Sequence, residues 1–306
     1  MNPNSQKHTK SRPIPKKKKL FFTIILPICI LLVLFSIWLI WANKALELNA
    51  YTIQSEQVPS SFDGFRIAHL SDLHNEEMGK GHEKLLSLLS EANPDIIVIT
   101  GDIVDCHRTD IDTVLRLAEK AVAIAPCYYV SGNHESLIGE DYERLKSGLT
   151  ERNVTVLSDE KIILERDGET VSMIGVNDPG FMTHYLSKDC DTVMENKLQN
   201  IGMDESEYTI LLSHRPELFE IYIKYGVDLV FSGHAHGGQF RLPLIGGWYA
   251  PNQGLLPEYD SGLYSKENTN MLVSRGIGNS LFPLRFNNRP EVILVELKAA
   301  ENIGNI

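Results

Sequence analysis

Cysteine is scarce in this sequence, with four residues in a chain of 306. Cys29 lies in an apolar run and Cys106, Cys127 and Cys190 follow it, which does not provide the even, closely spaced set of a disulfide framework. The spacings also match no structural zinc cluster. Glycine and proline are few as well, at 22 and 14 residues, which excludes collagen-like and low-complexity chains. We therefore expect a globular core that buries most of its thiols.

Positive charge is scarce outside the N-terminus. The formal net charge is -11, yet residues 1–44 hold eight Lys and Arg residues and no Asp or Glu. The remaining chain has 21 basic and 40 acidic residues. A body this acidic repels phosphate backbones, so no nucleic-acid binding surface is expected.

A run without charge covers residues 20–41. As a helix rising ~1.5 Å per residue it would span ~33 Å, which covers a bilayer core of roughly 30 Å. Seven basic residues precede the run and only Lys44 follows closely, so the positive-inside rule predicts a cytoplasmic tail over residues 1–19. A cleaved signal peptide is the alternative, but its apolar region would be shorter. We expect a single-pass signal anchor in the cell membrane, in contact with lipid, and an extracytoplasmic body.

The rest of the chain predicts one large α/β domain. We expect a juxtamembrane connector over residues 42–61, the domain over 62–298 and a C-terminal tail over 299–306. Helical spacing of apolar residues predicts helices over 82–92, 111–124 and 141–149. Short apolar runs predict strands over 65–70, 96–99, 128–130, 154–157, 162–164, 171–176, 209–212, 229–231, 271–274 and 292–297. Early strands alternate with helices, which favours a parallel or mixed sheet, and the later runs predict a second, more antiparallel sheet.

Polar side chains of the metal-ligand types follow five of the predicted strands. They are Asp72 and His74, Asp102 and Asp105, Asn133 and His134, His214, and His234 and His236. Because ligands bind outside the carboxyl ends of strands in open α/β sheets, we expect these side chains in one cleft. Gly101, Gly132 and Gly233 each precede a proposed ligand, as expected where the backbone turns sharply. Carboxylate, imidazole and amide groups suit Mn²⁺, Fe²⁺ or Zn²⁺, and seven ligands suit two ions that share a carboxylate.

The same series resembles the calcineurin-like metallophosphoesterase superfamily, over about residues 62–298. The matching motifs are Asp72-x-His74, Gly101-Asp102-x-x-Asp105, Gly132-Asn133-His134-Glu135, His214 and Gly233-His234-x-His236. The resemblance implies a four-layer α/β/β/α sandwich with two mixed sheets. It also implies that one ion is held by Asp72, His74, Asp102 and His236, and the other by Asp102, Asn133, His214 and His234. Asp102 would bridge the two ions.

The resemblance further implies the catalytic groups. A metal-bridging hydroxide would attack phosphorus in line, His134 would assist the leaving group, and Asp105 would orient His134. Protein serine/threonine phosphatases of this superfamily have an arginine where this chain has Cys106, and Arg108 lies two residues further on. This difference favours the smaller bacterial phosphodiesterase branch, whose membrane-anchored members are also similar at residues 237–239 and 274–278.

Two function classes follow. The first is a membrane-anchored dimetal phosphoesterase, a phosphodiesterase in preference to a protein phosphatase; the alternative is a catalytically silent sensor that binds phosphate or a nucleotide. A lipid-linked phosphodiester or pyrophosphate, a nucleotide and an envelope polymer all fit as substrate. Residues 237–257, rich in Gly, Pro and apolar side chains, are either a packed loop or a wall facing substrate or membrane. Arg215, Arg241, Arg275 and Arg285 are expected in structural or surface pairs.

Overall fold

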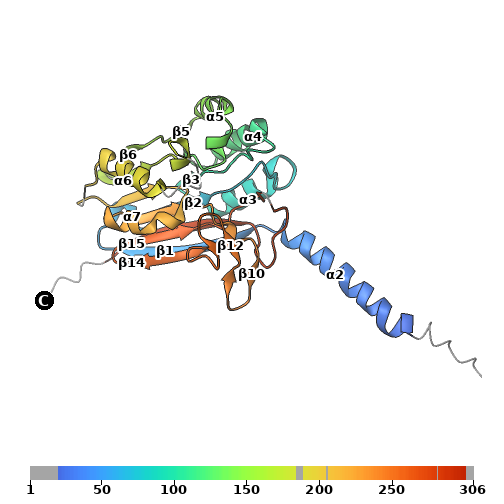
Figure 1. Ribbon diagram of the computed structural model, residues 1–306. Coiled ribbons are helices and arrows are strands. Elements are labelled where there is room, and N and C mark those ends of the chain that lie inside the picture. Colours follow the sequence, from blue (N-terminus) through green and yellow to red (C-terminus); the bar gives the residue numbers. More distant parts are fainter. Residues whose placement is uncertain (1–19, 184–188, 205, 281, 301–306) are drawn as a thin grey trace, which may run out of the picture. The chain divides into compact units, whose positions relative to one another are not determined.

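The computed structural model describes residues 20–183, 189–204, 206–280 and 282–300, in two compact units covering residues 1–41 and 42–306. The predicted basic tail over 1–19 and most of the predicted C-terminal tail lie outside the described residues. The first unit is helical, with a π-helix, η1 (Phe21–Ile25), followed by α2 (Leu26–Ala42). Within the described residues this is the one helix long and apolar enough to cross a membrane, and its apolar stretch is unburied (Figure 1).

The second unit contains two six-stranded sheets. Sheet A has the order β1 (Glu47–Ser55), β16 (Glu291–Ala299), β2 (Arg66–Leu70), β3 (Ile96–Thr100), β4 (Cys127–Val130), β5 (Val154–Val156). Sheet B has the order β14 (Gly262–Lys266), β15 (Thr269–Val273), β9 (Leu229–Ser232), β8 (Thr209–Leu212), β7 (Glu169–Gly175), β6 (Glu160–Arg166). Sheet A is parallel except where β16 meets β2, and sheet B is antiparallel only at its two edge pairs. Both sheets are therefore mixed, and sheet B is less antiparallel than its sequence predicts.

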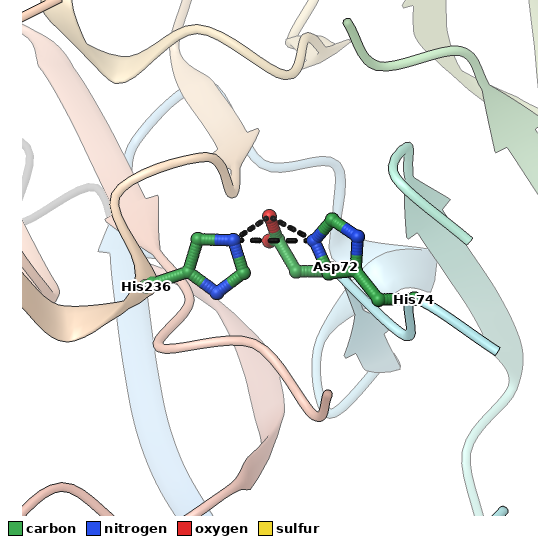
Figure 2. Close-up of side chains that lie close together, drawn as sticks. All are labelled: Asp72, His74 and His236. Atoms are coloured by element: carbon green, nitrogen blue, oxygen red, sulfur yellow. Dashed lines mark hydrogen bonds and ion pairs between the residues drawn. The ribbon is translucent and has the colours of Figure 1, made fainter. Parts of the chain in front are cut away.

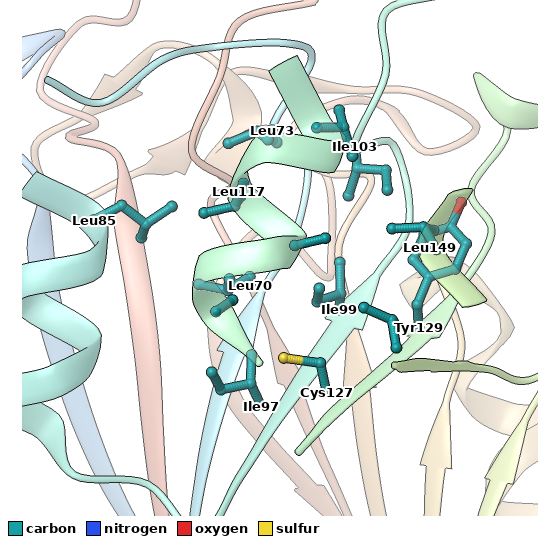
Figure 3. Packing of buried hydrophobic residues seen from close by; sticks show 14 of the residues in the cluster. Leu70, Leu73, Leu85, Ile97, Ile99, Ile103, Leu117, Cys127, Tyr129 and Leu149 are labelled. Atoms are coloured by element: carbon teal, nitrogen blue, oxygen red, sulfur yellow. The ribbon is translucent and has the colours of Figure 1, made fainter. Parts of the chain in front are cut away.

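Helices cover the outer face of each sheet. Sheet A carries α3 (Glu83–Ala92), α4 (Ile111–Ala121) and α5 (Asp141–Thr150), and sheet B carries α6 (Cys190–Ile201) and α7 (Phe219–Lys224). The alternation of β3 explains the layers, since Ile97 and Ile99 pack against helices while Ile96 and Val98 pack between the sheets. Figure 3 shows the outer core of sheet A, where Leu85, Leu117 and Leu149 come from the three helices. Three cores separate four layers, which confirms the predicted α/β/β/α sandwich.

Shorter elements complete the second unit. Two small hairpins follow β9, made of β10 (Arg241–Leu242) with β11 (Gly246–Gly247) and β12 (Tyr249–Ala250) with β13 (Gly254–Leu255). Single 3₁₀ turns are η2 (Ser60–Phe62), η3 (Lys80–His82), η4 (Glu135–Leu137), η5 (Pro179–Phe181), η6 (Pro216–Leu218) and η7 (His236–Gly238). In Figure 1 the orange hairpin labelled β10 projects beyond the strands of its own unit.

The predicted connector over residues 42–61 needs correction. Its central part is strand β1, which pairs in parallel with β16 from Glu47 opposite Glu291 to Ser55 opposite Ala299. Ile53 is the one buried residue of β1, so this edge strand lacks the apolar alternation that reveals a strand in a sequence. Its pairing partner, β16, lies more than 230 residues later in the sequence. The second unit therefore begins directly after the apolar helix.

Candidate metal centre

The predicted metal ligands follow the ends of parallel strands in both sheets. Asp72 and His74 follow β2, Asp102 follows β3, Asn133 follows β4, His214 follows β8, and His234 and His236 follow β9. All seven are at most 6% exposed. Backbone bonds join the loops, because the Asp72 N–H donates to Gly101 O and the His74 N–H to Asp102 O, both at 3.0 Å. The tips of both sheets thus meet at one buried polar cluster.

Two glycines allow this close approach for different reasons. Gly101 has φ +85°, in the left-handed region that favours glycine. Gly233 has an ordinary φ, but a Cβ there would lie 1.9 Å from Ser71 Oγ and 2.3 Å from Asp72 Oδ2. The prediction that glycines mark sharp turns is confirmed at Gly101, whereas Gly233 makes room for a carboxylate.

The backbone of the cluster is strained. Five of the seven predicted ligands have φ between 45° and 65°: Asp72, His74, Asp102, His234 and His236. A non-glycine residue in this region costs on the order of 1–3 kcal/mol, so the surrounding structure must enforce the conformation. Such strain concentrates at functional sites.

One group of ligand atoms comes from Asp72, His74 and His236 (Figure 2). His236 Nε2 lies 3.4 Å from Asp72 Oδ1 and 3.2 Å from His74 Nε2. His74 Nε2 lies 3.9 Å from the same carboxylate oxygen. Figure 2 shows the carboxylate between the two imidazole rings. Three donors at these separations can surround one cation with bonds of roughly 2.0–2.2 Å.

A second group comes from Asp102, His214 and His234. Asp102 Oδ1 accepts the His134 N–H at 2.8 Å, which fixes the carboxylate. Its other oxygen, Oδ2, lies 3.2 Å from His214 Nε2 and 3.8 Å from His74 Nε2. Oδ2 of Asp102 therefore faces residues of both groups, as a carboxylate that two cations could share would do.

The free lone pairs in the cluster fit metal ions. Asn133 Oδ1 and His214 Nε2 are buried and have no hydrogen-bond partner within the described part of the chain. The His214 ring donates from Nδ1 to Thr100 O at 2.6 Å, so Nε2 is the nitrogen that faces Asp102 and could bind a cation after losing its proton. His234 contacts other side chains through Nε2, which lies 3.0 Å from Asn252 Oδ1 and 3.4 Å from Arg215 Nη1. These are the donor types that divalent transition metals need.

Burial sets the charge of the imidazoles. It lowers the pKa of His74 and His234 well below the usual range and that of His236 to about 4, so all three are neutral at pH 7. At His214 burial also lowers the pKa, but the Asp102 carboxylate outweighs it and raises the pKa to about 10. A cation held beside Asp102 would supply the positive charge that this proton now supplies.

His134 lies at the edge of the cluster with a defined tautomer. Its Nδ1 accepts the Cys106 N–H at 3.0 Å, so the neutral ring carries its proton on Nε2. Nε2 lies 3.3 Å from Ser280 Oγ and 4.0 Å from Asp102 Oδ2. The carboxylate of Asp105 accepts the His107 N–H at 2.8 Å and Arg108 Nη2 at 3.2 Å. Asp105 thus holds the turn that carries the Cys106 N–H, which binds His134.

Glu135 is a positioning residue to which sequence reasoning assigned no role. Its buried carboxylate accepts N–H groups of Asp102, Ile103, Val104 and Gly132 at 2.6–3.3 Å. Burial raises its pKa to about 7 in spite of these bonds. One side chain therefore ties the loop after β3 to the loop after β4. In the sequence, the position of Glu135 within the motif Gly132-Asn133-His134-Glu135 was the signal that could have pointed to this role.

The cluster opens into a cavity of about 350 Å³. The lining residues include Asp102, Cys106, Asn133, His134, His234 and His236, and also Leu137, Tyr249, Pro251 and Phe282. Cys106 therefore faces the cavity, whereas the side chain of Arg108 is 71% exposed. Tyr249 and Pro251 belong to residues 237–257, for which the sequence left a wall facing substrate open, whereas nothing in the sequence linked Phe282 to the metal motifs. One wall is polar and the other is apolar.

The four arginines noted in the sequence differ in the groups that their side chains contact. Arg215 bonds Asp178 at 2.5 and 2.9 Å, Arg241 pairs with Asp260 and Arg275 with Glu47, as predicted. Arg285 is fully buried and donates to the carbonyl oxygens of Arg275 and Gly278. It supports the chain around the cavity instead of forming an ion pair.

Comparison with known proteins places this geometry in a family. Residues 65–238, more than half of the chain, match the family model of the calcineurin-like phosphoesterases. The chain is also 31% identical to the uncharacterized metallophosphoesterase YkuE of Bacillus subtilis over 259 residues, which are 83% of this chain and 86% of that protein. The chain belongs to the calcineurin-like phosphoesterases. Its enzyme class is that of metal-dependent phosphoester hydrolases, and dimetal centres are used in this family.

Other relatives of this phosphoesterase carry further names. Phosphodiesterase YaeI of Escherichia coli is 28% identical over 76% of this chain and 82% of its own length. A transmembrane protein with metallophosphoesterase domain from Danio rerio is 29% identical over 81% of this chain and 56% of its own length. Among solved structures, TT1561 of Thermus thermophilus matches with a TM-score of 0.49 and 12% identity over 70% of this chain and 90% of that one.

Proposed function

We propose that this phosphoesterase is a membrane-anchored hydrolase that cleaves phosphodiesters at a two-metal centre. The observation that carries the proposal is the position of Asp102 Oδ2, which faces buried ligands of both groups. Two divalent cations, Mn²⁺, Fe²⁺ or Zn²⁺, would supply positive charge and a lowered water pKa for in-line attack on phosphorus. The residues that hold them are Asp72, His74, Asp102 and His236 for one, and Asp102, Asn133, His214 and His234 for the other.

His134 is proposed to protonate the leaving oxygen. Because Nδ1 accepts the Cys106 N–H, the proton is on Nε2, the nitrogen within 4.0 Å of Asp102 Oδ2. A departing alkoxide needs a proton, and an imidazole with its proton on the nitrogen that faces the alkoxide can deliver it. Asp105 acts through the turn that carries Cys106 and is a positioning residue.

The apolar wall and Cys106 favour a diester over a phosphoprotein. No arginine of the described residues lines the cavity, while Cys106, Leu137, Tyr249 and Phe282 do. A dianionic monoester needs more cationic contacts than a singly charged diester, which also brings a second organic group to occupy an apolar wall. The name of the relative YaeI is consistent with this class.

The test uses the full chain purified in detergent, depleted of metal by a chelator and reloaded with Mn²⁺, Fe²⁺ or Zn²⁺. We expect hydrolysis of bis(p-nitrophenyl) phosphate to exceed that of p-nitrophenyl phosphate, with two metal ions bound per chain. If Asp102→Asn loses both metal ions and the surface control Asp112→Asn retains both, the result would support a carboxylate shared by the two ions. Binding of phosphate esters by the loaded protein without turnover would instead support the silent sensor.

The proposed location is the cell membrane, with the catalytic unit outside. The apolar helix and the transmembrane relative support an anchor, and the basic residues before the helix support a cytoplasmic N-terminus. Protease added to intact cells should cut the catalytic unit and leave an N-terminal tag intact. Cleavage of the tag with protection of the catalytic unit would reverse the orientation.

A further inference from the structure

Exposed apolar side chains lie in the chain segments that also carry the cavity-lining residues Tyr249 and Phe282. We call six of them the apolar rim: Leu244, Ile245, Trp248, Leu255, Phe282 and Leu284, which are 41–108% exposed. Leu244 is at the tip of the β10–β11 hairpin, and Phe282 also lines the cavity. Water-exposed apolar groups gathered at a functional opening are typical of a surface that meets a membrane or a partner.

Hydrogen bonds and one ring contact join the segments that carry Trp248, Phe282 and Leu284. The Trp248 N–H donates to Phe240 O at 2.8 Å, and the rings of Phe240 and Phe282 lie 5.1 Å apart. Gln239 Nε2 donates to the carbonyl oxygens of Phe282 and Leu284 at 2.9 and 2.6 Å. Gln239 is three residues after His236, so the same short loop holds the rim and a proposed metal ligand.

The same segment is bonded to the start of the catalytic unit. Asn43 Nδ2 donates to Arg285 O at 2.9 Å, and the Arg285 N–H donates to Asn43 Oδ1 at 2.7 Å. Arg285 follows Leu284 directly, and Ala42 alone separates Asn43 from Trp41 of the apolar helix. Two residues of chain span at most ~7 Å. If the helix crosses a bilayer, covalent connection keeps Asn43, and with it the rim segment, at the interface.

We propose that the apolar rim enters the interfacial layer of the same bilayer and that the cleft cleaves a phosphodiester carried by a membrane-resident amphiphile. This inference rests on the proposed hydrolase function and names its substrate class. The buried polar floor would take the phosphate, and the rim would contact the acyl chains. Because basic residues are few in the body, the rim should bind neutral lipid, with no requirement for anionic headgroups.

The reaction needs no further reactant besides water. The oxygen of water bonds to phosphorus, and the bond from phosphorus to one ester oxygen breaks. That oxygen takes the proton of His134 Nε2 and leaves as an alcohol, and His134 regains the proton that water releases. The products are one phosphomonoester and one alcohol.

The first experiment reads the position of the rim without using activity. The chain has three tryptophans, so Trp38→Phe with Trp41→Phe leaves Trp248 as the one emitter. The full chain with these changes is placed in phosphatidylcholine vesicles, with and without brominated acyl chains. We expect brominated lipid to quench Trp248 and iodide in solution not to quench it. Quenching by iodide but not by bromine would overturn the proposal.

The second experiment separates rim contact from chemistry. Leu244→Ser with Ile245→Ser is compared with Ile163→Ser and Leu263→Ser, which change exposed apolar residues on the edge strands β6 and β14. In vesicles the rim variant should hydrolyse a diacylglycerol-linked phosphodiester about tenfold more slowly, and bis(p-nitrophenyl) phosphate within about twofold of the unchanged chain. The control variant should match the unchanged chain on both. If the rim variant, compared with the unchanged chain, loses the same factor in rate on both substrates or loses nothing on either, the proposal is overturned.

The remaining outcomes are also informative. Shielding of Trp248 from both quenchers, with a rim variant that is monomeric where the unchanged chain is dimeric, would make the rim an interface between copies and overturn the lipid contact. Absence of hydrolysis of either substrate with every metal would overturn the proposed function, whereas the quenching of Trp248 would still decide whether the rim meets lipid.

Discussion

The floor of the cleft, which consists of the proposed metal ligands, and the apolar rim differ in the kind of residue that each buries or exposes. At the floor, charged and polar ligands are buried and several have strained backbones. At the rim, large apolar side chains are left in water. Both arrangements make folding less favourable. Burying a polar group costs free energy unless the group finds a partner, and an apolar group that stays exposed contributes no free energy of burial. The difference indicates two tasks: the floor is built for cations and phosphate, and the rim for an apolar surface.

The largest effect should come from the shared carboxylate at the floor. Asp102→Asn removes the charge that both cations need, so kcat/KM for a soluble diester should fall roughly a thousandfold or more, with loss of bound metal. Chelation of the unchanged chain should have the same effect and be reversed by added metal. Metal analysis with kinetics checks this, and Asp112→Asn on α4 is the matched control. Two ions retained with full turnover would remove the floor's assigned role.

A smaller effect is expected at His134. His134→Gln removes the proton donor and leaves the ligands in place, so kcat should fall about 10²- to 10³-fold while the metal content stays at two per chain. The loss should be less for a diester with a good leaving group, such as p-nitrophenol, than for an alkyl ester, because a good leaving group needs no proton. Equal losses for the two esters would contradict the assignment.

The change at Asp105 should be weaker still. Asp105→Asn keeps an oxygen that can accept the His107 N–H, and the Cys106 N–H still binds His134, so a decrease of about tenfold or less in kcat is expected. A direct contact between Asp105 and His134 would produce a loss as large as that of His134→Gln. Comparing the two variants on one alkyl diester decides between these arrangements.

The smallest effect belongs to the rim. Leu255→Ser exchanges a side chain that is 66% exposed, so the free energy of unfolding should change by no more than about 0.5 kcal/mol. Leu211→Ser, on the fully buried strand β8, should lower it by several kcal/mol, on the order of 2–5. Denaturant unfolding of both variants measures the contrast. A large loss at Leu255 would show that the rim is part of the packing.

Local sequence patterns were enough for most of the fold. The continuous apolar run of β3, which is buried on both faces, and the helical spacing of α4 are each readable within a dozen residues. The gathering of the metal-ligand residues in one cleft could also be predicted from the sequence. These residues follow the strands, and parallel strands bring their carboxyl ends to one edge of a sheet. The apolar helix was readable from length and charge alone.

Other features depend on partners far away in the chain. Strand β1 exists because β16 pairs with it, and its edge position leaves no apolar alternation to read. The bond from the Cys106 N–H to His134 Nδ1 is another example, since the turn of the backbone decides which donor reaches that nitrogen.

The sequence by itself determined the element order, the residue types at the strand ends and the apolar helix, because these depend on local periodicity and composition. Only the tertiary structure decided that Asn43 and Arg285, 242 residues apart, bond to each other and that Phe282 borders the metal cavity. The physical reason is that hydrogen bonds and packing between distant segments depend on how the two sheets close on each other, and no local pattern records that geometry.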